Sequence, residues 1–371
     1  MLSKPTARST RKRLALVAAV GVVVAIVPGT ATGATGPDTV ENVIPKIEDL
    51  DGPRGIAVGP PRRIVYAQAD GSITQTVLRG EGAGTTLLGN VPPSFLAPAV
   101  SQPDNRSAHI LTVGGEPGSG GATLYKWSRG TGDITAVADI AAYQETDPDP
   151  YNQEGPPEES NPYGVASLDD GSALVADAAG NDLLRVWPDG TIVTVARLRP
   201  RVVLVPEELE GIEGLPPPGT PITAEGVATS VTVGADGAYY VGELRGFPAT
   251  PGTSEVWRIE PDSVDAVCNP RKPTEGSCTR YADGFTSIVD LAAGPNGEIY
   301  VVELVKRSWL QWELEIAEPI GGLFRIPAPG AEPVEHAPDR LILPGGADVS
   351  DDGRLFVSGP VFGPGSIVRV R

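Results

Sequence analysis

The chain has 371 residues, of which 40% are hydrophobic, so it can bury a sizeable core and is not wholly disordered. It contains 46 glycines and 38 prolines, well above the usual combined share of ~12%. So many turn formers leave little room for long helices and favour short strands joined by tight turns. A net charge of −18 argues against a nucleic-acid partner, and two cysteines with two histidines are too few for a Cys/His zinc site.

The first 34 residues have the order of a secretory signal peptide. A basic start that ends at Arg13 leads into an apolar run, Leu14 to Val27, which small residues follow. This run is shorter than the ~20 residues that a membrane-spanning helix needs, although an uncleaved membrane anchor is the alternative. We therefore expect residues 1–34 to direct export, and the mature chain to be an acidic secreted or cell-envelope protein without a membrane span.

Further along the chain, residues 38–371 contain one phrase six times. The phrase is a short apolar strand, an Asp-Gly or Asn-Gly turn, a second strand that ends in an acid, and a third strand with an arginine. The clearest copy predicts four strands, at Gly164–Leu168, Ala173–Asp177, Leu183–Trp187 and Ile192–Ala196. The other copies begin at Arg54, Pro98, Ser230, Ser287 and Gly346.

The turn pairs of these copies favour two-residue hairpins, because Asp-Gly and Asn-Gly adopt the positive φ angles that such turns require. A four-stranded antiparallel sheet cannot bury both faces alone, so the copies must stack on one another. Radial stacking predicts an all-β fold, a six-bladed β-propeller of four-stranded antiparallel blades over residues 38–371. A linear solenoid is the alternative. The four clear turns are Asp170-Gly171, Asp236-Gly237, Asn296-Gly297 and Asp352-Gly353.

The two ends of the repeat region suggest how the ring closes. The last copy reaches Arg371 after three strands, whereas a strand-like stretch, Thr39 to Ile47, precedes the first copy. We predict that this N-terminal strand completes the last blade and ties both ends of the chain together, so that the closed ring has no exposed strand edges between blades.

Three insertions interrupt the strands. Two acidic, Pro- and Gly-rich segments, Tyr143–Ser160 and Pro206–Glu225, lead into first strands and should lie over the same rim of the ring. Ala138–Glu145 is the one short helix that we expect. Cys268 and Cys278 flank a loop between a third and a fourth strand, which places them at the opposite rim. Export would favour a disulfide between them, and two unrelated free thiols are the alternative.

One blade, Ser160–Val186, resembles the signature blade of the ScyD/ScyE family, which comprises exported or periplasmic propellers. The stretches at 230–248 and 284–304 resemble the same family. The blade phrase is more distantly similar to NHL repeats and to TolB-like and gluconolactonase-type propellers. The resemblance implies the fold and export, and it carries no established reaction.

Oxygen-bearing side chains follow the second strands or lie near the first strands, where propeller loops open around the central channel. They suggest an acidic channel mouth for an unknown small molecule or envelope protein, with Arg54 and Arg245 as the basic exceptions. Carboxylates suit Ca²⁺ or another divalent cation, and an anionic mouth would also attract a cationic ligand. The alternative is structural, because a strand-end acid often accepts N–H bonds from its own turn. The candidate ligand-binding residues are Asn161, Asp177, Asn181, Glu243, Asp290 and Glu303, with Asp177, Glu243 and Glu303 as candidate metal ligands.

Support for catalysis is thinner. Motifs of a serine nucleophile are absent, and His109 looks like a half-buried strand residue. Trp309 and Trp312 lie in an insertion on the proposed channel side, where they could stack on a planar or sugar ligand; alternatively, the insertion folds back and buries them. We therefore favour a monomeric, non-enzymatic binding or interaction module. The alternative is a divalent-metal-dependent lactonase or related hydrolase, and a third hypothesis is an accessory role in pigment assembly.

Overall fold

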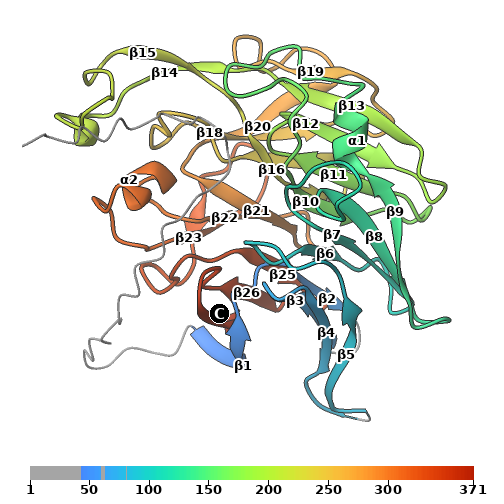
Figure 1. Ribbon diagram of the computed structural model, residues 1–371. Helices are drawn as coiled ribbons and strands as arrows, with labels where there is room; N and C mark the ends of the chain where they lie inside the picture. Colours follow the sequence, from blue (N-terminus) through green and yellow to red (C-terminus); the bar gives the residue numbers. More distant parts are fainter. Residues whose placement is uncertain (1–42, 60–62, 81) are drawn as a thin grey trace, which may run out of the picture.

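The computed structural model describes residues 43–59, 63–80 and 82–371, so the predicted signal peptide at 1–34 lies outside the described residues. Six antiparallel sheets surround a common axis (Figure 1). The first strand of each sheet contacts the first strands of the two neighbouring sheets, and the contact between β2 and β25 completes the circle. The predicted six-bladed propeller is confirmed.

The first three blades follow the order of the chain. Blade 1 contains β2 (Ile56–Gly59), β3 (Arg63–Ala67), β4 (Ser72–Val77) and β5 (Gly84–Asn90). Blade 2 contains β6 (Ala99–Ser101), β7 (Ser107–Leu111), β8 (Thr123–Ser128) and β9 (Ile134–Asp139). Blade 3 contains β10 (Pro162–Ser167), β11 (Ala173–Asp177), β12 (Asp182–Val186) and β13 (Ile192–Leu198).

The last three blades include the strand that brings the two ends of the repeat region together. Blade 4 contains β16 (Ala228–Val233), β17 (Tyr239–Glu243), β18 (Ser254–Ile259) and β20 (Cys278–Phe285). Blade 5 contains β21 (Ile288–Ala293), β22 (Ile299–Glu303), β23 (Gly322–Ile326) and β24 (Val334–Glu335). Blade 6 contains β25 (Gly346–Val349), β26 (Leu355–Gly359), β27 (Pro364–Val370) and β1 (Val43–Asp51).

Strand β1 is the outermost strand of blade 6. It pairs antiparallel with β27, from Val43 opposite Val370 to Asp51 opposite Pro364. The strand therefore continues beyond Ile47, the last residue of the predicted N-terminal strand. The first described segment and the last segment of the chain thus share one sheet.

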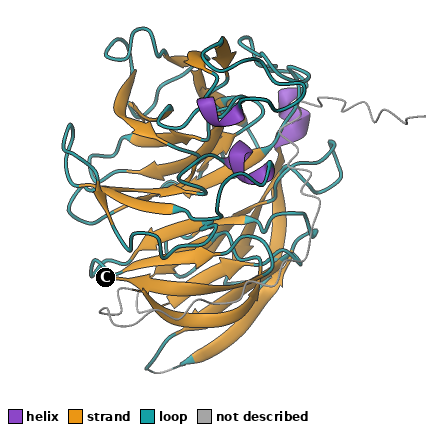
Figure 2. Ribbon diagram, turned by 90° about the vertical axis from the view of Figure 1, so that its left-hand side faces the viewer, coloured by secondary structure: helices purple, strands orange, loops and turns teal. Residues whose placement is uncertain are grey.

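The remaining elements lie in connections between strands, and Figure 2 shows how few of them are helical. The expected helix forms as α1 (Ile140–Gln144), capped by Asp139, whose Oδ1 accepts from the Ala142 N–H at 3.0 Å. We expected one helix, but α2 (Trp309–Glu313) and the short 3-10 helix η1 (Glu207–Leu209) also form. Among the described residues, none of these helices is long or apolar enough to cross a bilayer.

The second strands of blades 3, 4 and 5 are the most deeply buried. Every residue of β11, β17 and β22 is buried, because each strand lies in the middle of a sheet that is covered on both faces by neighbouring blades. The contact between blades 3 and 4, for example, packs Leu174 and Leu183 with Val241 and Trp257. Apolar side chains therefore pack between neighbouring blades.

Each rim of the ring has its own set of connections. The turns between first and second strands form one rim, which we call the hairpin face. The connections from second to third strands, and from one blade to the next, form the other rim, which we call the channel face. Segment 143–160 lies on the channel face, as does segment 206–225. The latter follows β14 (Arg201–Leu204) and includes β15 (Pro221–Ala224), the strand that pairs with β14 in a hairpin.

A disulfide joins Cys268 and Cys278 at the hairpin face, as the sequence predicts. Cys268 ends the short strand β19 (Ala266–Cys268), which lies between β18 and β20 and pairs in parallel with β13 of blade 3. The Arg199 N–H also donates to the Cys268 carbonyl at 3.0 Å. The bridged loop therefore connects blade 4 to blade 3.

We predict that the double substitution Cys268→Ala and Cys278→Ala lowers the free energy of unfolding by about 2–3 kcal/mol, because the reduced unfolded chain gains loop entropy. Urea unfolding of the oxidised wild type and the double variant measures this difference. An unchanged midpoint would contradict a stabilising role of this loop.

Candidate functional site

Asp177, at the end of β11, folds into its own turn. It is fully buried, and its carboxylate accepts hydrogen bonds from the Ser160 hydroxyl at 2.6 Å, the Asn161 N–H at 2.7 Å and the Ala179 and Gly180 N–H groups at 3.1 and 3.2 Å. Burial raises its pKa. This is the structural alternative that the sequence left open, and it leaves no oxygen of Asp177 directed at the channel.

Asn181 connects blade 3 to its neighbours on the channel face. Its Oδ1 accepts from the Val227 N–H at 2.8 Å, just before blade 4, and its Nδ2 donates to Asp149 at 3.0 Å in the insertion that precedes blade 3. Asn161 contributes its backbone N–H to Asp177. Both candidate residues therefore hold connections in place.

Glu243, the corresponding acid of blade 4, belongs to a buried ion cluster. Its Oε1 accepts from Trp257 Nε1 at 2.7 Å, and its Oε2 pairs with Arg245, which also contacts Glu255 at 2.9 Å. All three charged residues are at most 1% exposed. Burial raises the pKa of Glu243, and the charge of Arg245 opposes that shift. These three charged side chains are enclosed within the blade and present no charge to solvent.

Glu303, the acid of blade 5, repeats the arrangement of blade 3. Its Oε1 accepts from the Thr286 N–H, which lies just before β21, at 2.6 Å. The residue is 4% exposed, and burial raises its pKa to about 8. A strand-end acid thus fastens the start of the first strand in both blades.

Asp290 is the one candidate acid on an innermost strand. Its Oδ2 accepts from the Ala347 N–H of blade 6 at 2.7 Å, and burial raises its pKa to about 7. Nearby, Arg54 donates from Nε to the Ala97 carbonyl and from Nη1 to the Tyr163 carbonyl, both at 2.7 Å, and its guanidinium lies 4.1 Å from the centroid of the Tyr163 ring. Arg54 therefore links blade 1 to blades 2 and 3 across the axis.

The proposed metal ligands do not come together. Asp177, Glu243 and Glu303 each make their hydrogen bonds within their own blade or its adjoining connections, and the described part of the chain contains no group of three or more His, Cys, Asp or Glu residues arranged to hold a metal ion. Asp177, Glu243 and Glu303 therefore stay a prediction as metal ligands, and the structure gives them no shared site. The other candidates stay predictions as ligand contacts.

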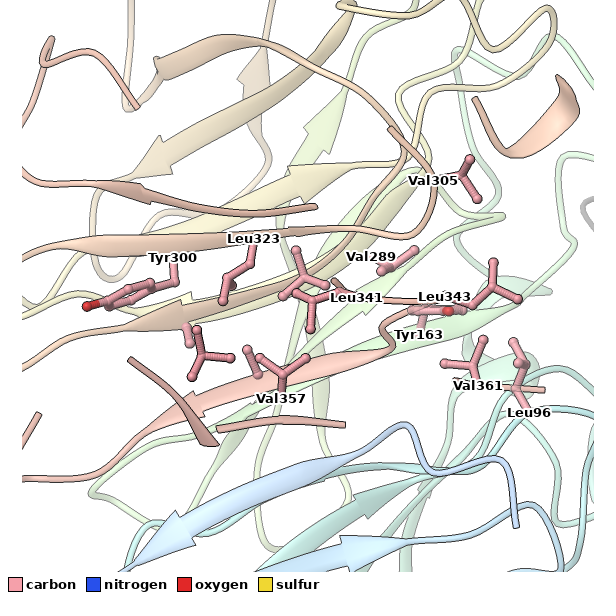
Figure 3. Packing of buried hydrophobic residues seen from close by; sticks show 14 of the residues in the cluster. Leu96, Tyr163, Val289, Tyr300, Val305, Leu323, Leu341, Leu343, Val357 and Val361 are labelled. Atoms are coloured by element: carbon pink, nitrogen blue, oxygen red, sulfur yellow. The ribbon is translucent and has the colours of Figure 1, made fainter. Parts of the chain in front are cut away.

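An apolar cluster occupies the centre of the channel face instead (Figure 3). Successive side chains of a strand point in opposite directions. The residue that follows each strand-end acid therefore faces the channel, where we had expected the acid. Ala178 is part of the cluster, and Leu244 and Leu304 pack against it. Figure 3 shows the channel end of the cluster, formed by Leu96, Tyr163, Val289, Val305, Leu343 and Val361.

Three aromatic rings continue this cluster outward; we call Phe95, Phe362 and Trp312 the aromatic strip. The rings of Trp312 and Phe362 stack at 5.6 Å with an interplanar angle of 13°, and Phe95 lies 5.3 Å from Phe362. Phe95 precedes blade 2, Phe362 follows β26 of blade 6, and Trp312 belongs to α2 of blade 5. Phe95 is 45% exposed, so the strip offers an open aromatic edge.

Of the three rings of the aromatic strip, only Trp312 was predicted from the sequence as a ligand contact. Trp312 was a candidate, and it lies on the channel side as proposed, but packed against Phe362 of another blade. Trp309 donates from Nε1 to the Arg245 carbonyl at 3.0 Å and so fixes α2 to blade 4. The missed residues, Phe95 and Phe362, are single aromatics among prolines and glycines in connecting loops, a signal that could have identified them.

His109 is a buried residue of β7, more deeply placed than expected. It is 2% exposed, its Nδ1 lies 2.8 Å from the Ser167 hydroxyl, and burial lowers its pKa to about 4. A buried histidine that stays neutral near pH 7 and forms a hydrogen bond with a serine of the next blade has a structural role here.

No protein-family model matches the chain, and no curated protein matches it. Solved structures do. A gluconolactonase from Xanthomonas campestris is 10% identical, with 89% of each chain covered and a TM-score of 0.53. The PQQ domain of a pyranose dehydrogenase from Coprinopsis cinerea is 12% identical, with 89% of this chain and 95% of that chain covered and a TM-score of 0.53.

A third similar structure is a structural genomics protein of unknown function from Bacteroides thetaiotaomicron. It is 11% identical, covers 87% of this chain and 70% of its own, and has a TM-score of 0.52. Identities this low support the fold alone, because one propeller fold carries many unrelated activities. The chain is a six-bladed β-propeller with an unassigned activity.

In the wild type, the free energy of unfolding should fall as pH rises, because Glu303 has a raised pKa. We predict that Glu303→Gln removes this dependence. The raised pKa means that the folded state keeps a proton that the unfolded state releases near pH 4.5, so stability is lost as pH rises from there through about 8. The amide retains the oxygen that accepts from Thr286. At pH 8 the variant should be more stable than wild type by roughly 2–4 kcal/mol, and nearly equal at pH ~4.5.

Urea unfolding at both pH values measures this difference. The control is Glu210→Gln, which changes an exposed glutamate of the same face. An equal pH dependence in wild type and Glu303→Gln would show that Glu303 is ionised in the folded protein.

Proposed function

We propose that the protein is an exported ligand-binding module that takes a flat, uncharged ring, such as a sugar or a planar aromatic, on the aromatic strip. The observation that carries this proposal is the series of three rings, spaced 5.3 and 5.6 Å apart, which three separate segments bring together beside the channel. Apolar ring faces bind sugars and planar molecules through stacking.

The surroundings of the strip support an uncharged ligand. The centre of the channel face is apolar, and the strand-end acids beneath it are buried and hydrogen-bonded. A cationic ligand would find no exposed carboxylate among Asp177, Glu243 and Glu303. Apolar stacking is therefore the interaction that this part of the face offers.

Export is supported by two features. The sequence begins with the pattern of a signal peptide, and both cysteines form a disulfide, which persists in oxidising compartments. We therefore propose the secreted fraction or the cell envelope as its location. We also propose that it is a monomer related to ScyD/ScyE propellers, on the resemblance of its blades. The rival hypothesis, a metal-dependent lactonase, has less support because the proposed carboxylate ligands are dispersed.

The proposal predicts binding to members of a panel of cell-envelope oligosaccharides and planar aromatic compounds, followed by tryptophan fluorescence and calorimetry. Phe95→Ala and Trp312→Ala should each weaken binding about tenfold, because each removes one stacking ring. The melting temperature of Phe95→Ala should stay close to that of wild type, since the ring is largely exposed.

The matched control is Leu87→Ala, which removes an exposed side chain of similar size from the outer strand β5, 58% exposed. Its binding should equal that of wild type. Binding that is insensitive to Phe95 and Trp312, or the absence of any ligand in the panel, would contradict the proposal.

A further inference from the structure

A cleft lies on the hairpin face, where blade 6 meets blade 1. Its volume is about 310 Å³, and we call it the basic cleft after four of its lining residues: Lys46, Arg79, Arg354 and Arg369. Ile64, Leu78 and Phe356 provide an apolar floor, which continues into the core between these two blades. The cleft is therefore on the opposite rim from the aromatic strip.

The charge of the cleft is opposite to that of the chain. Four basic side chains line it beside two acids, Asp351 and Asp352, which leaves an excess of two positive charges in a protein of net charge −18. Asp352 is engaged with Arg354 at 2.9 Å. A positive site of this kind attracts anions over its acidic surroundings.

Arg369 differs from the third-strand arginines of blades 3 and 4, although Arg325 of blade 5 also has a buried Nε without a partner among the described residues. In blade 3, the third-strand arginine Arg185 pairs with the hairpin acid Asp170 at 2.6 Å. In blade 4, Arg258 pairs in the same way with Asp236 at 2.9 Å. In blade 6 the hairpin acid is taken by Arg354, which has no counterpart in blades 3 and 4.

The consequence is a guanidinium group that is not fully paired. Arg369 lies opposite Phe356 in the register of β26 and β27, on the same side of β27 as Ile367, which packs in the core between blades 6 and 1. Its Nε is buried and has no hydrogen-bond partner among the described residues. A buried donor without a partner costs free energy unless a ligand or water accepts from it.

A larger cleft on the channel face does not share this excess of positive charge. It has a volume of about 500 Å³ beside α2, and its lysine, Lys306, is already held by Glu335 at 2.8 Å and Asp339 at 2.7 Å. Neighbouring carboxylates thus balance the charge of Lys306, and of these two clefts the basic cleft is the one with an excess of positive charge.

We infer that the basic cleft binds a small amphipathic oxyanion, a ligand whose phosphate or carboxylate group contacts Arg369 and Lys46 while its apolar part covers the half-buried Val58 and Leu78. The planar guanidinium suits oxyanions because it donates in a fixed fork geometry. Lys46 and Arg79 are exposed at the opening and attract the ligand from solution. The junction of the first and last blades would then carry a binding site of its own.

Calorimetric titration of the purified protein with phenyl phosphate and with benzoate tests this inference. Phenyl phosphate should bind saturably, and its affinity should fall as salt is added. Arg369→Gln should weaken binding about tenfold through loss of the charged donor. Stronger binding of phenyl phosphate identifies a phosphoryl ligand, and equal binding of benzoate identifies a carboxylate ligand; both results support the site.

The matched control is Arg185→Gln, the equivalent third-strand arginine of blade 3, which should bind phenyl phosphate as the wild type does. Lys46→Gln serves as a second variant, because an exposed lysine can be replaced without loss of folding, and it should also weaken binding. The inference is overturned if wild type shows no saturable binding up to about 10 mM of either probe. It is also overturned if Lys46→Gln leaves the affinity unchanged or Arg185→Gln lowers it as much as Arg369→Gln.

Discussion

Around the axis, side chains of one blade's innermost strand bond to the backbone of the next. Asp290 of blade 5 accepts from the Ala347 N–H, and Asp348 of blade 6 accepts from the Val58 N–H of blade 1 at 2.6 Å. Ser101 accepts from the Ser167 N–H at 2.9 Å, and Thr229 donates to the Ile288 carbonyl at 2.6 Å. An inner strand has no sheet neighbour on its channel side, so these bonds satisfy groups that would otherwise be unpaired. They also fix the order and spacing of the blades.

This inner ring leaves little space. A Cβ at Gly164 would lie 2.8 Å from Ser230 Cα, and one at Gly346 would lie 2.4 Å from the Arg54 carbonyl oxygen, so both junctions require glycine. Because the strands lie this close, the carboxylates near the axis accept hydrogen bonds from the neighbouring blades and are not available to a ligand. The surfaces available to ligands are displaced outward, to the aromatic strip on one rim and the basic cleft on the other.

The fold could be predicted because its determinants are local. In blade 3, Asp170-Gly171 sets the first hairpin, and the strands around it form at Pro162–Ser167 and Ala173–Asp177, within two residues of their predicted bounds. The site could not be predicted in the same way, because an acid such as Asp177 is exposed or enclosed according to whether the connection before β10 reaches it. The aromatic strip depends on residues as distant as Phe95 and Phe362, and a single sequence gives no distance between them.

Amide hydrogen exchange of wild type and Asp348→Ala tests the role of the inner ring most directly. The account predicts that the innermost strands β2 and β25 are strongly protected in wild type. It further predicts that the substitution speeds exchange at Val58 and its neighbours in β2, while β11 of blade 3, on the far side of the ring, keeps its protection. Unchanged exchange in β2 would contradict the account, because the bond from Val58 to Asp348 would then contribute nothing to joining the first and last blades.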